Sequence, residues 1–378
     1  METHESLYRD LQRHIDRMPV PFPETLSHKE IKILKHLFTP EEAEIALALS
    51  ALPEDAHRIN KRLKKLGFSD NELFEKLRTM ELKGAIVGTV PPSGQEKKFS
   101  KAQLVIGMFE FQVDRISKEM TRDFEDYVYN EFREAAFNSG TKQMRTIPVE
   151  ESLDGGKKVE PWDNIVQLVR ENTRVAAVMN CVCRQSKEAL GQKVAHPELE
   201  ETCLTFGAAA RWMVDKGIAH YIDNNEVMNI IEKAREAGFV LQPENARKPD
   251  FICCCNRECC HALGVLKTFE RPADYVHSNF TAATESEKCS GCETCIGICP
   301  MEAISLVDGK AEVNTGRCIG CGNCVTRCDN NALFMVPREK NHVPPENHDT
   351  MYQQILKERF GFLGTLKVVA KAMIGMKI

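Results

Sequence analysis

The stretch CSGCETCIGICP, from Cys289 to Pro300, carries four cysteines spaced C-x2-C-x2-C-x3-C. The same spacing returns in CIGCGNCVTRCD, from Cys318 to Asp329. Between the runs, AISLVDGKAEVN alternates around Asp308-Gly309, which predicts a β-hairpin. Two sets of four thiols at this spacing favour metal ligation over core packing or zinc sites.

These runs resemble the two-cluster ferredoxins of bacteria over residues 285–337, and Pro300 follows the first run as in that family. There, three close cysteines hold one 4Fe–4S cluster, and the fourth crosses to the other cluster. The resemblance implies two ligand sets: Cys289, Cys292, Cys295 with Cys328, and Cys318, Cys321, Cys324 with Cys299. Asp329 departs from the family's second proline and leaves these ligands intact.

The other eight cysteines form a second group upstream: Cys181, Cys183, Cys203, Cys253, Cys254, Cys255, Cys259 and Cys260. We expect Cys181 and Cys183 to continue a buried strand, RVAAVMN, and Cys203 to begin a helix, CLTFGAAARWMVDKG. In an extended chain, alternation sends Cys253 and Cys255 to one face and Cys254 to the other, and likewise groups Cys181 with Cys183. The stretch FICCCNRECC is therefore read as half of a metal site whose other half lies earlier in the chain.

Three chemistries fit this second group. One or two further 4Fe–4S clusters are our first interpretation, and a zinc site or unliganded redox thiols are the alternatives. His261, beside Cys260, is the one histidine considered as an additional ligand, whereas His196 and His220 are expected to be ordinary polar residues. The whole arrangement resembles a group of generic 4Fe–4S binding proteins of anaerobes, a resemblance that implies no particular reaction.

Composition limits the remaining choices. At 378 residues with 42% apolar residues, the chain can fill two to four domains. It begins METHESLYRD and contains no apolar run of about 18 residues, so we expect a cytoplasmic protein with reduced thiols. A net charge of −5 gives no general attraction to nucleic acid.

The first 110 residues, which lack cysteine, predict four amphipathic helices: SHKEIKILKHLF, TPEEAEIALALSAL, PEDAHRINKRLKKLG and SDNELFEKLRTMELKG. Thr39 with Glu42 and Ser69 with Glu72 are capping boxes. The strand-like segments AIVGTV and FSKAQLVIG follow. Over residues 27–109 this order resembles a winged-helix domain.

Such a domain suggests DNA binding through residues 71–82 and through Lys97, Lys98 and Lys101. However, residues 1–110 contain 17 basic and 17 acidic residues, and Glu72, Glu75 and Glu81 lie on the helix that would enter the groove. A DNA-binding face should be basic, so we favour a structural or protein-docking role. The basic run Lys61, Arg62, Lys64 and Lys65 is expected to be solvated or to face an acidic redox partner.

Two further segments complete the chain. Residues 111–169 are expected to be a helical linker, with a strand-like RTIPVEESL and a turn at residues 154–156. The tail predicts an amphipathic helix with Phe362, Leu366, Val369, Met373 and Ile374 on one side. We expect it to pack on the protein or on a partner subunit, with peripheral membrane contact as the alternative.

The sequence thus predicts an α+β multi-domain protein. Its parts are a winged-helix-like domain (1–110), the linker (111–169), an α/β cysteine-rich domain (170–281), a ferredoxin domain (282–340) and the tail (341–378). Three or more clusters, without a GxGxxG or P-loop motif, favour an electron-transfer protein that works with redox partner proteins, alone or as a subunit of a larger oxidoreductase. The alternative is a redox-sensing transcription regulator; catalytic residues and oligomeric state stay open.

Overall fold

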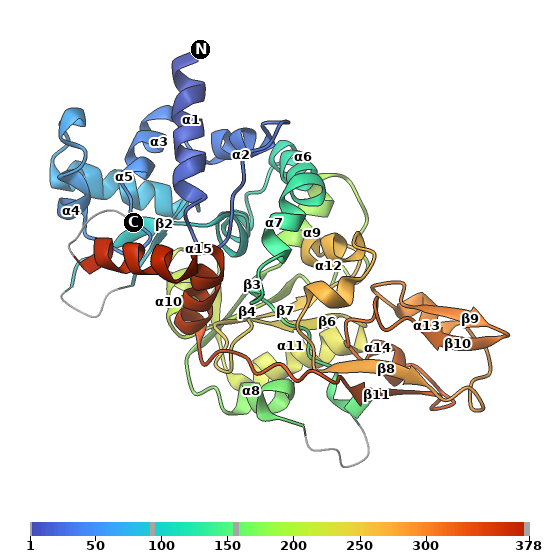
Figure 1. Cartoon of the computed structure of the whole chain (residues 1–378). Helices are drawn as coiled ribbons and strands as arrows, with labels where there is room; N and C mark the ends of the chain where they lie inside the picture. Colours follow the sequence, from blue (N-terminus) through green and yellow to red (C-terminus); the bar gives the residue numbers. More distant parts are fainter. Residues whose placement is uncertain (1, 91–94, 154–158, 374–378) are drawn as a thin grey trace.

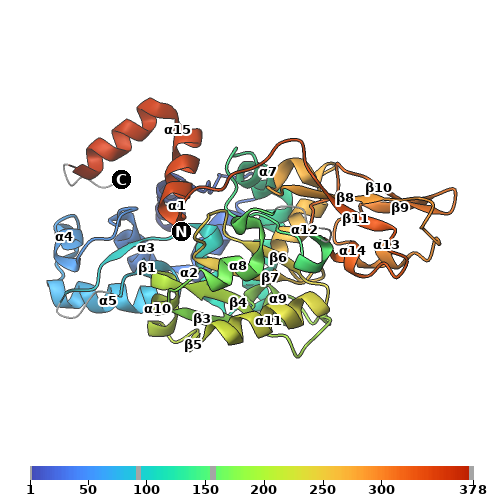
Figure 2. The same ribbon diagram turned by 90° about the horizontal axis from the view of Figure 1, so that it is seen from below.

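A computed structural model describes residues 2–90, 95–153 and 159–373. The N-terminal helices and the unit that carries the last eight cysteines lie at opposite ends, and a five-stranded sheet lies between them (Figures 1 and 2). The mixture of helices and antiparallel strands confirms the α+β class.

Five helices and a short hairpin form the N-terminal unit. The elements are α1 (Glu2–Ile15), α2 (Lys29–Leu37), α3 (Pro40–Leu47), α4 (Ala56–Asn60), α5 (Asp70–Leu82), β1 (Ile86–Gly88) and β2 (Phe99–Lys101). Both predicted capping boxes are present, at Thr39 and at Ser69. The third predicted helix, PEDAHRINKRLKKLG, was too long, because α4 ends at Asn60 and a separate 3-10 turn covers Lys64–Leu66. We also predicted too long a second strand: β2 ends at Lys101, and the chain then turns back on itself, with Met108 N donating to Gln103 O at 2.9 Å.

The segment expected to be a linker is part of the core. Its helices are α6 (Lys118–Tyr127), α7 (Arg133–Phe137) and α8 (Ile165–Arg170). Phe124, Tyr127 and Phe132 are buried in the same apolar core as α1 to α5, and this core continues to Trp212 and Val265 of the cysteine-rich part. Residues 145–147 make isolated bridges and no regular strand, and the expected turn at 154–156 lies outside the described residues.

The central sheet has the strand order β5-β3-β4-β7-β6. Its strands are β3 (Ala176–Asn180), β4 (Glu201–Phe206), β5 (His220–Ile222), β6 (Val240–Pro243) and β7 (Phe251–Cys255). Every neighbouring pair is antiparallel, so the expectation of an α/β domain was wrong for this part. One face packs on α8 and α11 (Asn224–Glu236) through residues such as Leu204, Ile231 and Ile252.

The remaining helices of this region begin just after its strands. They are α9 (Val182–Ala189) after β3, α10 (Gly207–Asp215) after β4 and α12 (His261–Lys267) after β7. In Figure 1, α9 and α12 lie together with α6 and α7 on the side of the sheet opposite α8. The face of the sheet opposite α8 and α11 therefore looks toward these helices and the N-terminal unit. We call it the cysteine face, because it carries Cys203, Cys253 and Cys255.

The ferredoxin-like unit is built from two similar halves. It contains β8 (Phe280–Thr284), α13 (Thr294–Ile298), β9 (Ile304–Val307), β10 (Lys310–Val313), α14 (Asn323–Thr326) and β11 (Leu333–Pro337). The predicted hairpin is present, because β9 and β10 pair around Asp308-Gly309, both with positive φ. β8 pairs antiparallel with β11 and closes the unit.

The C-terminal helix α15 (His348–Met373) returns from this unit toward the N-terminal helices (Figure 1). Met351 and Ile355 are buried, and Arg359 donates to Asp16 at 2.8 Å. The helix bends at Gly361, where φ is 68°. Beyond the bend Leu366 is 48% exposed; of the other residues on the predicted apolar side, Phe362, Val369 and Met373 have side chains that the structure does not describe, and Ile374 lies outside the described residues. No helix in the described ranges is long and apolar enough to cross a membrane.

Candidate metal centres

The ferredoxin-like cysteines are held in place by backbone amides. Four alanine amides donate to cysteine sulfur atoms at 3.2 to 3.4 Å: Ala282 to Cys318, Ala303 to Cys299, Ala311 to Cys289, and Ala332 to Cys328. The amide of Ala311 is the largest cause of a lowered pKa for Cys289. Hydrogen bonds from backbone amides stabilise thiolates, so these cysteines are suited to be the anionic ligands of an iron–sulfur cluster.

The fourth cysteine of the first run lies with the second run. Cys299 lines a small internal cavity of about 20 Å³ together with Cys318, Cys321 and Cys324. This is the ligand set that the ferredoxin pattern assigns to one cluster. At the other end, Asn330 Nδ2 donates to Ser290 Oγ at 2.7 Å and holds the end of the second run against the beginning of the first.

Two equivalent glycines allow this close approach. Gly291 and Gly320 each precede the second cysteine of their run and have φ values of 73° and 75°. A Cβ atom on Gly320 would lie 2.3 Å from the carbonyl oxygen of Phe280, and one on Gly291 would lie 2.5 Å from that of Gly309. A side chain at either position would clash with backbone, so the turn requires glycine.

The two ligand sets differ in exposure. In the first set Cys292 is exposed, Cys289 and Cys328 are half-buried and Cys295 is buried. In the second set Cys318, Cys321 and Cys324 are buried and Cys299 is half-buried. The second set also touches the rest of the chain, because Val149 N donates to Cys321 O at 3.1 Å. The first set therefore lies at the solvent side and the second at the side of the central sheet.

The upstream cysteines come from three places around that sheet. Cys203 lies on β4 directly opposite Cys253 of β7, and Cys255 follows on the same face. Cys181 and Cys183 begin α9, and Cys259 and Cys260 precede α12.

Two local expectations for these cysteines were wrong. Cys203 is a strand residue, since α10 starts only at Gly207. Cys181 and Cys183 are not an extended clip, because the chain turns into α9 directly after Cys181. The alternation expected for β7 was right: Cys254 lies in the core on the α8 and α11 face, and Cys253 and Cys255 lie on the other face.

Seven of the eight upstream thiols form one continuous chain of hydrogen-bonding contacts. Its order is Cys259, Cys181, Cys183, Cys260, Cys255, Cys253 and Cys203. Cys254 is the member that points away. Four or more soft ligands at one place are what a 4Fe–4S cluster requires, so this constellation fits such a group.

The charges around the seven thiols also fit an anionic metal centre. Hydrogen bonds from neighbouring thiols lower the pKa of three of them, Cys181, Cys253 and Cys260. The same hydrogen bonds, together with burial, raise the pKa of the other four, so thiolates alternate with thiols along the chain. Arg184 is 1% exposed, its positive charge acts on Cys259, and its Nε atom has no partner among the described residues. A buried guanidinium is costly unless negative charge compensates it, and thiolates would supply that charge.

A cavity of about 1770 Å³ opens beside this constellation. Its wall includes six of the seven cysteines of this chain, all except Cys259: Cys181, Cys183, Cys203, Cys253, Cys255 and Cys260. Much of the rest is aromatic, with Phe109, Phe124, Phe132, Phe137 and Trp212. Ligand sites are usually about 300–1,000 Å³, so a small molecule has room beside a cluster.

Sequence reasoning missed Glu110, which also lines the cavity. Burial raises the pKa of Glu110 to about 8, and the charges of Cys253 and Cys260 act in the same direction. The amide of Gly107 donates to its carboxylate at 2.6 Å. No sequence motif marks this glutamate, because tertiary packing alone brings it to the cysteines.

His261 is not among the sulfur contacts. Its Nε2 atom lies 3.1 Å from Ser186 Oγ, and its ring packs edge-on against Phe109 and Phe124. Burial lowers its pKa to about 3, which keeps the ring neutral. His196 and His220 are exposed and lie near Glu198 and Glu201, as expected of ordinary polar residues.

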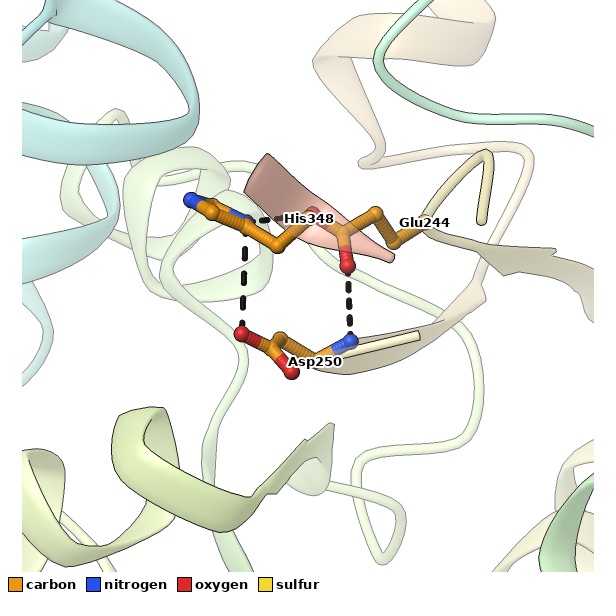
Figure 3. A group of neighbouring side chains, drawn as sticks. All are labelled: Glu244, Asp250 and His348. Carbon is orange, nitrogen blue, oxygen red and sulfur yellow. Dashed lines mark hydrogen bonds and ion pairs between the residues drawn. The ribbon is translucent and has the colours of Figure 1, made fainter. Parts of the chain in front are cut away.

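A second polar cluster, also missed, lies at the start of α15 (Figure 3). Glu244, Asp250 and His348 place three potential ligand atoms within 4.8 Å of one another. His348 Nδ1 is 2.6 Å from Glu244 Oε1, and Asp250 N donates to Glu244 Oε2 at 2.7 Å. Burial disfavours the charged form of His348, but the hydrogen bond to Glu244 outweighs it and raises the pKa. These contacts describe an ion-pair anchor between α15 and the loop joining β6 to β7.

Comparison with known proteins bears on one of these centres. Residues 282–329 match the family model described as a 4Fe-4S dicluster domain. No curated protein matches the chain, and no solved structure matches it. The chain therefore contains a 4Fe–4S dicluster domain, which is typical of iron–sulfur electron-transfer proteins.

Proposed function

We propose that this protein is an oxidoreductase component in which two ferredoxin-type clusters pass electrons to a further thiolate-bound cluster at the cavity. Cys289, Cys292, Cys295 and Cys328 would hold the entry cluster. Cys318, Cys321, Cys324 and Cys299 would hold the middle one, and the seven upstream cysteines would hold the last. When bound, such clusters supply one-electron transfer.

The observation that carries the proposal is the convergence of seven thiols, six of them on the wall of a cavity large enough for a substrate. A pure carrier needs clusters near its surface, whereas a cluster beside a large, mainly apolar cavity is suited to reducing a small molecule. The aromatic wall would exclude water from that molecule.

Packing supports the order of transfer. Cys255 and Cys260 share one apolar core with Cys295, Cys318 and Cys324. The ferredoxin-like unit is also fixed to its neighbours by side chains. Asn323 donates to Gly238 O at 2.6 Å, and Arg317 donates to Phe269 O at 3.1 Å. A rigid contact keeps donor and acceptor clusters at a constant separation.

The exposed Cys292 side is where an external redox protein would dock. The N-terminal unit, in contrast, is the weaker candidate for partner DNA. Lys97 contacts Glu81 and Asp215 at 2.9 and 2.6 Å, and the buried Lys101 donates to His14 O at 3.0 Å. Trp212 Nε1 also donates to Glu81 Oε1 at 2.6 Å, so α5 packs against α10. A winged-helix-like unit used for docking fits these contacts better than a transcription regulator does.

Metal analysis of the anaerobically purified full chain tests the proposal. We expect about 12 iron atoms per chain, or about 16 with two upstream clusters, against about 8 for the ferredoxin-like unit alone. The double change Cys181→Ser and Cys183→Ser should remove the excess iron and its EPR signal. Cys254→Ser is the matched control, since that thiol faces the other core.

Three results would contradict the proposal. One is about 8 iron atoms together with stoichiometric zinc, which would make the upstream site structural. Another is an upstream cluster that retains its full EPR signal in the double variant. Thiols that react rapidly with an alkylating reagent and hold no metal would indicate dithiol chemistry instead.

A further inference from the structure

Three segments that are distant in sequence meet at the hydroxyl group of Tyr352, on the wall of the cavity. Tyr352 lies on α15, Gln103 follows β2, and Gln143 belongs to the segment after α7. Gln103 Nε2 is 2.6 Å and Gln143 Nε2 is 2.8 Å from Tyr352 Oη. Both side-chain amides therefore form hydrogen bonds with the same oxygen atom.

The orientation of each amide follows from its second contact. Gln103 Nε2 also donates to the carbonyl oxygen of Ile106, and Gln143 Nε2 to that of Val105, each at 3.1 Å. Only the nitrogen of a carboxamide can donate to a carbonyl, so the nitrogen atoms are the ones that face Tyr352. The phenol oxygen thus accepts two hydrogen bonds, which occupy both of its lone pairs.

The phenol proton has no acceptor among the described residues. Accepting two bonds polarises an O–H group and makes it a stronger donor. A buried donor that is left without a partner destabilises the protein. Tyr352 is half-buried and lines the cavity, so an acceptor can reach it from there.

The charges of the wall select a neutral acceptor. Four basic residues of the wall, Arg17, Arg211, Lys357 and Lys371, are solvent-exposed, and the others are already engaged. His348, whose ring packs against Tyr352, bonds to Glu244 at 2.6 Å. Lys142 donates to Ser139 O at 2.5 Å, Arg174 pairs with Asp250 at 2.5 Å, and Lys101 donates to a backbone carbonyl. A carboxylate at Tyr352 would find none of these cations free, whereas a carbonyl oxygen needs one donor alone.

We propose that the cavity binds an uncharged organic molecule with an aromatic or alkyl body and a carbonyl oxygen, which accepts the hydrogen bond of Tyr352. Gln103 and Gln143 position the hydroxyl, and the aromatic wall holds the body. The inference rests on the proposed function in one respect: this molecule would be the electron acceptor at the upstream cysteines. Its binding requires no electron transfer.

The test compares two probes of equal shape in the resting full-length holoprotein, without reductant. ¹⁹F NMR titration measures the Kd of 4-fluoroacetophenone and of 1-ethyl-4-fluorobenzene, which lacks the oxygen. One net hydrogen bond makes the ketone bind about threefold to tenfold more tightly. Tyr352→Phe should abolish this preference without changing the binding of the ethyl compound. The control Tyr275→Phe removes another hydroxyl from the same wall and should keep the preference.

Phenylalanine preserves the ring, and both glutamine amides keep their backbone acceptors, so the variant should fold. If it does not, Gln143→Met, which removes one amide donor, should reduce the ketone preference. Equal affinity for both probes in the unchanged protein, or a preference that survives in Tyr352→Phe, would overturn the inference. Tighter binding of 4-fluorobenzoate than of the ketone would overturn its neutral character. A ketone preference without electron transfer to the upstream site would instead refute the proposed function alone.

Discussion

The sulfur atoms of the first and fourth cysteines of each ferredoxin-like run accept hydrogen bonds from the backbone amides of alanines. Ala303 and Ala332 each follow the fourth cysteine of their run by four residues, and each donates back to its sulfur. Local sequence therefore orients Cys299 and Cys328, whereas Cys299 lies beside cysteines of the opposite run. Cys299 and Cys318 line the same small cavity, although they belong to different runs.

At this scale we predict that Cys299→Ser alters the cluster of the second run and that Cys328→Ser alters the cluster of the first. The reason is that each fourth ligand crosses over. EPR of the reduced variants measures the damage. A soluble paramagnetic complex distinguishes the two clusters, because it speeds the spin relaxation of the cluster on the exposed Cys292 side more strongly than that of the other cluster. Damage confined to the cluster of the same run would disprove the crossing.

Among the elements, α15 depends on an electrostatic anchor at its first turn. His348 pairs with Glu244, which is fully buried on the loop after β6, and the pKa of His348 is raised. A raised pKa means that the folded state binds the proton more tightly than the unfolded chain. The stabilisation is thus complete below about pH 6.5 and is lost as the pH rises through the folded pKa.

We predict that the free energy of unfolding falls between pH 6 and pH 8.5 and that His348→Gln removes this part of the pH dependence. The effect should stay below about 1 kcal/mol, because the His348 side chain is partly solvent-exposed and screened. Urea unfolding at the two pH values measures it, with His196→Gln as an exposed control. If the pH dependence is unchanged in His348→Gln, the pair of His348 with Glu244 is not its cause.

Across the whole molecule, the elements that carry the cysteines extend from the outer end of the ferredoxin-like unit to the central sheet (Figure 1). β9, β10 and α13 form the outer end of the ferredoxin-like unit, and α14 lies nearer the central sheet. Cys295 is on α13 and Cys324 on α14. Under the proposed function, electrons would enter at the outer end.

The corresponding prediction uses Cys292→Ala, which removes a ligand from the outer cluster alone. A reduced bacterial ferredoxin, used as the donor, should reduce the upstream site at least tenfold more slowly in this variant, because the entry cluster is impaired. Dithionite, a small reductant, should reduce that site in both proteins, and stopped-flow absorbance follows the two rates. Equal rates with the protein donor would show that electrons enter elsewhere.

The sequence by itself determined what is local. Cysteine spacing gave the two ferredoxin-like runs, the Asp308-Gly309 turn gave the hairpin, and the Thr39 and Ser69 caps gave two helix starts, because each depends on neighbours a few residues away. Strand alternation likewise separated Cys254 from Cys253 and Cys255. These features need no knowledge of the rest of the chain.

Only the tertiary structure decided which distant segments come into contact. The sequence around Cys203 reads equally well as a helix start, and the pairing of β4 with β7 made it a strand opposite Cys253. Glu110, Gln103, Gln143 and Tyr352 carry no motif, yet packing of the N-terminal unit and α15 on the cysteine face brings them to one cavity. Side-chain chemistry is set by residue type, but which side chains meet depends on long-range packing free energy that no short window of sequence contains.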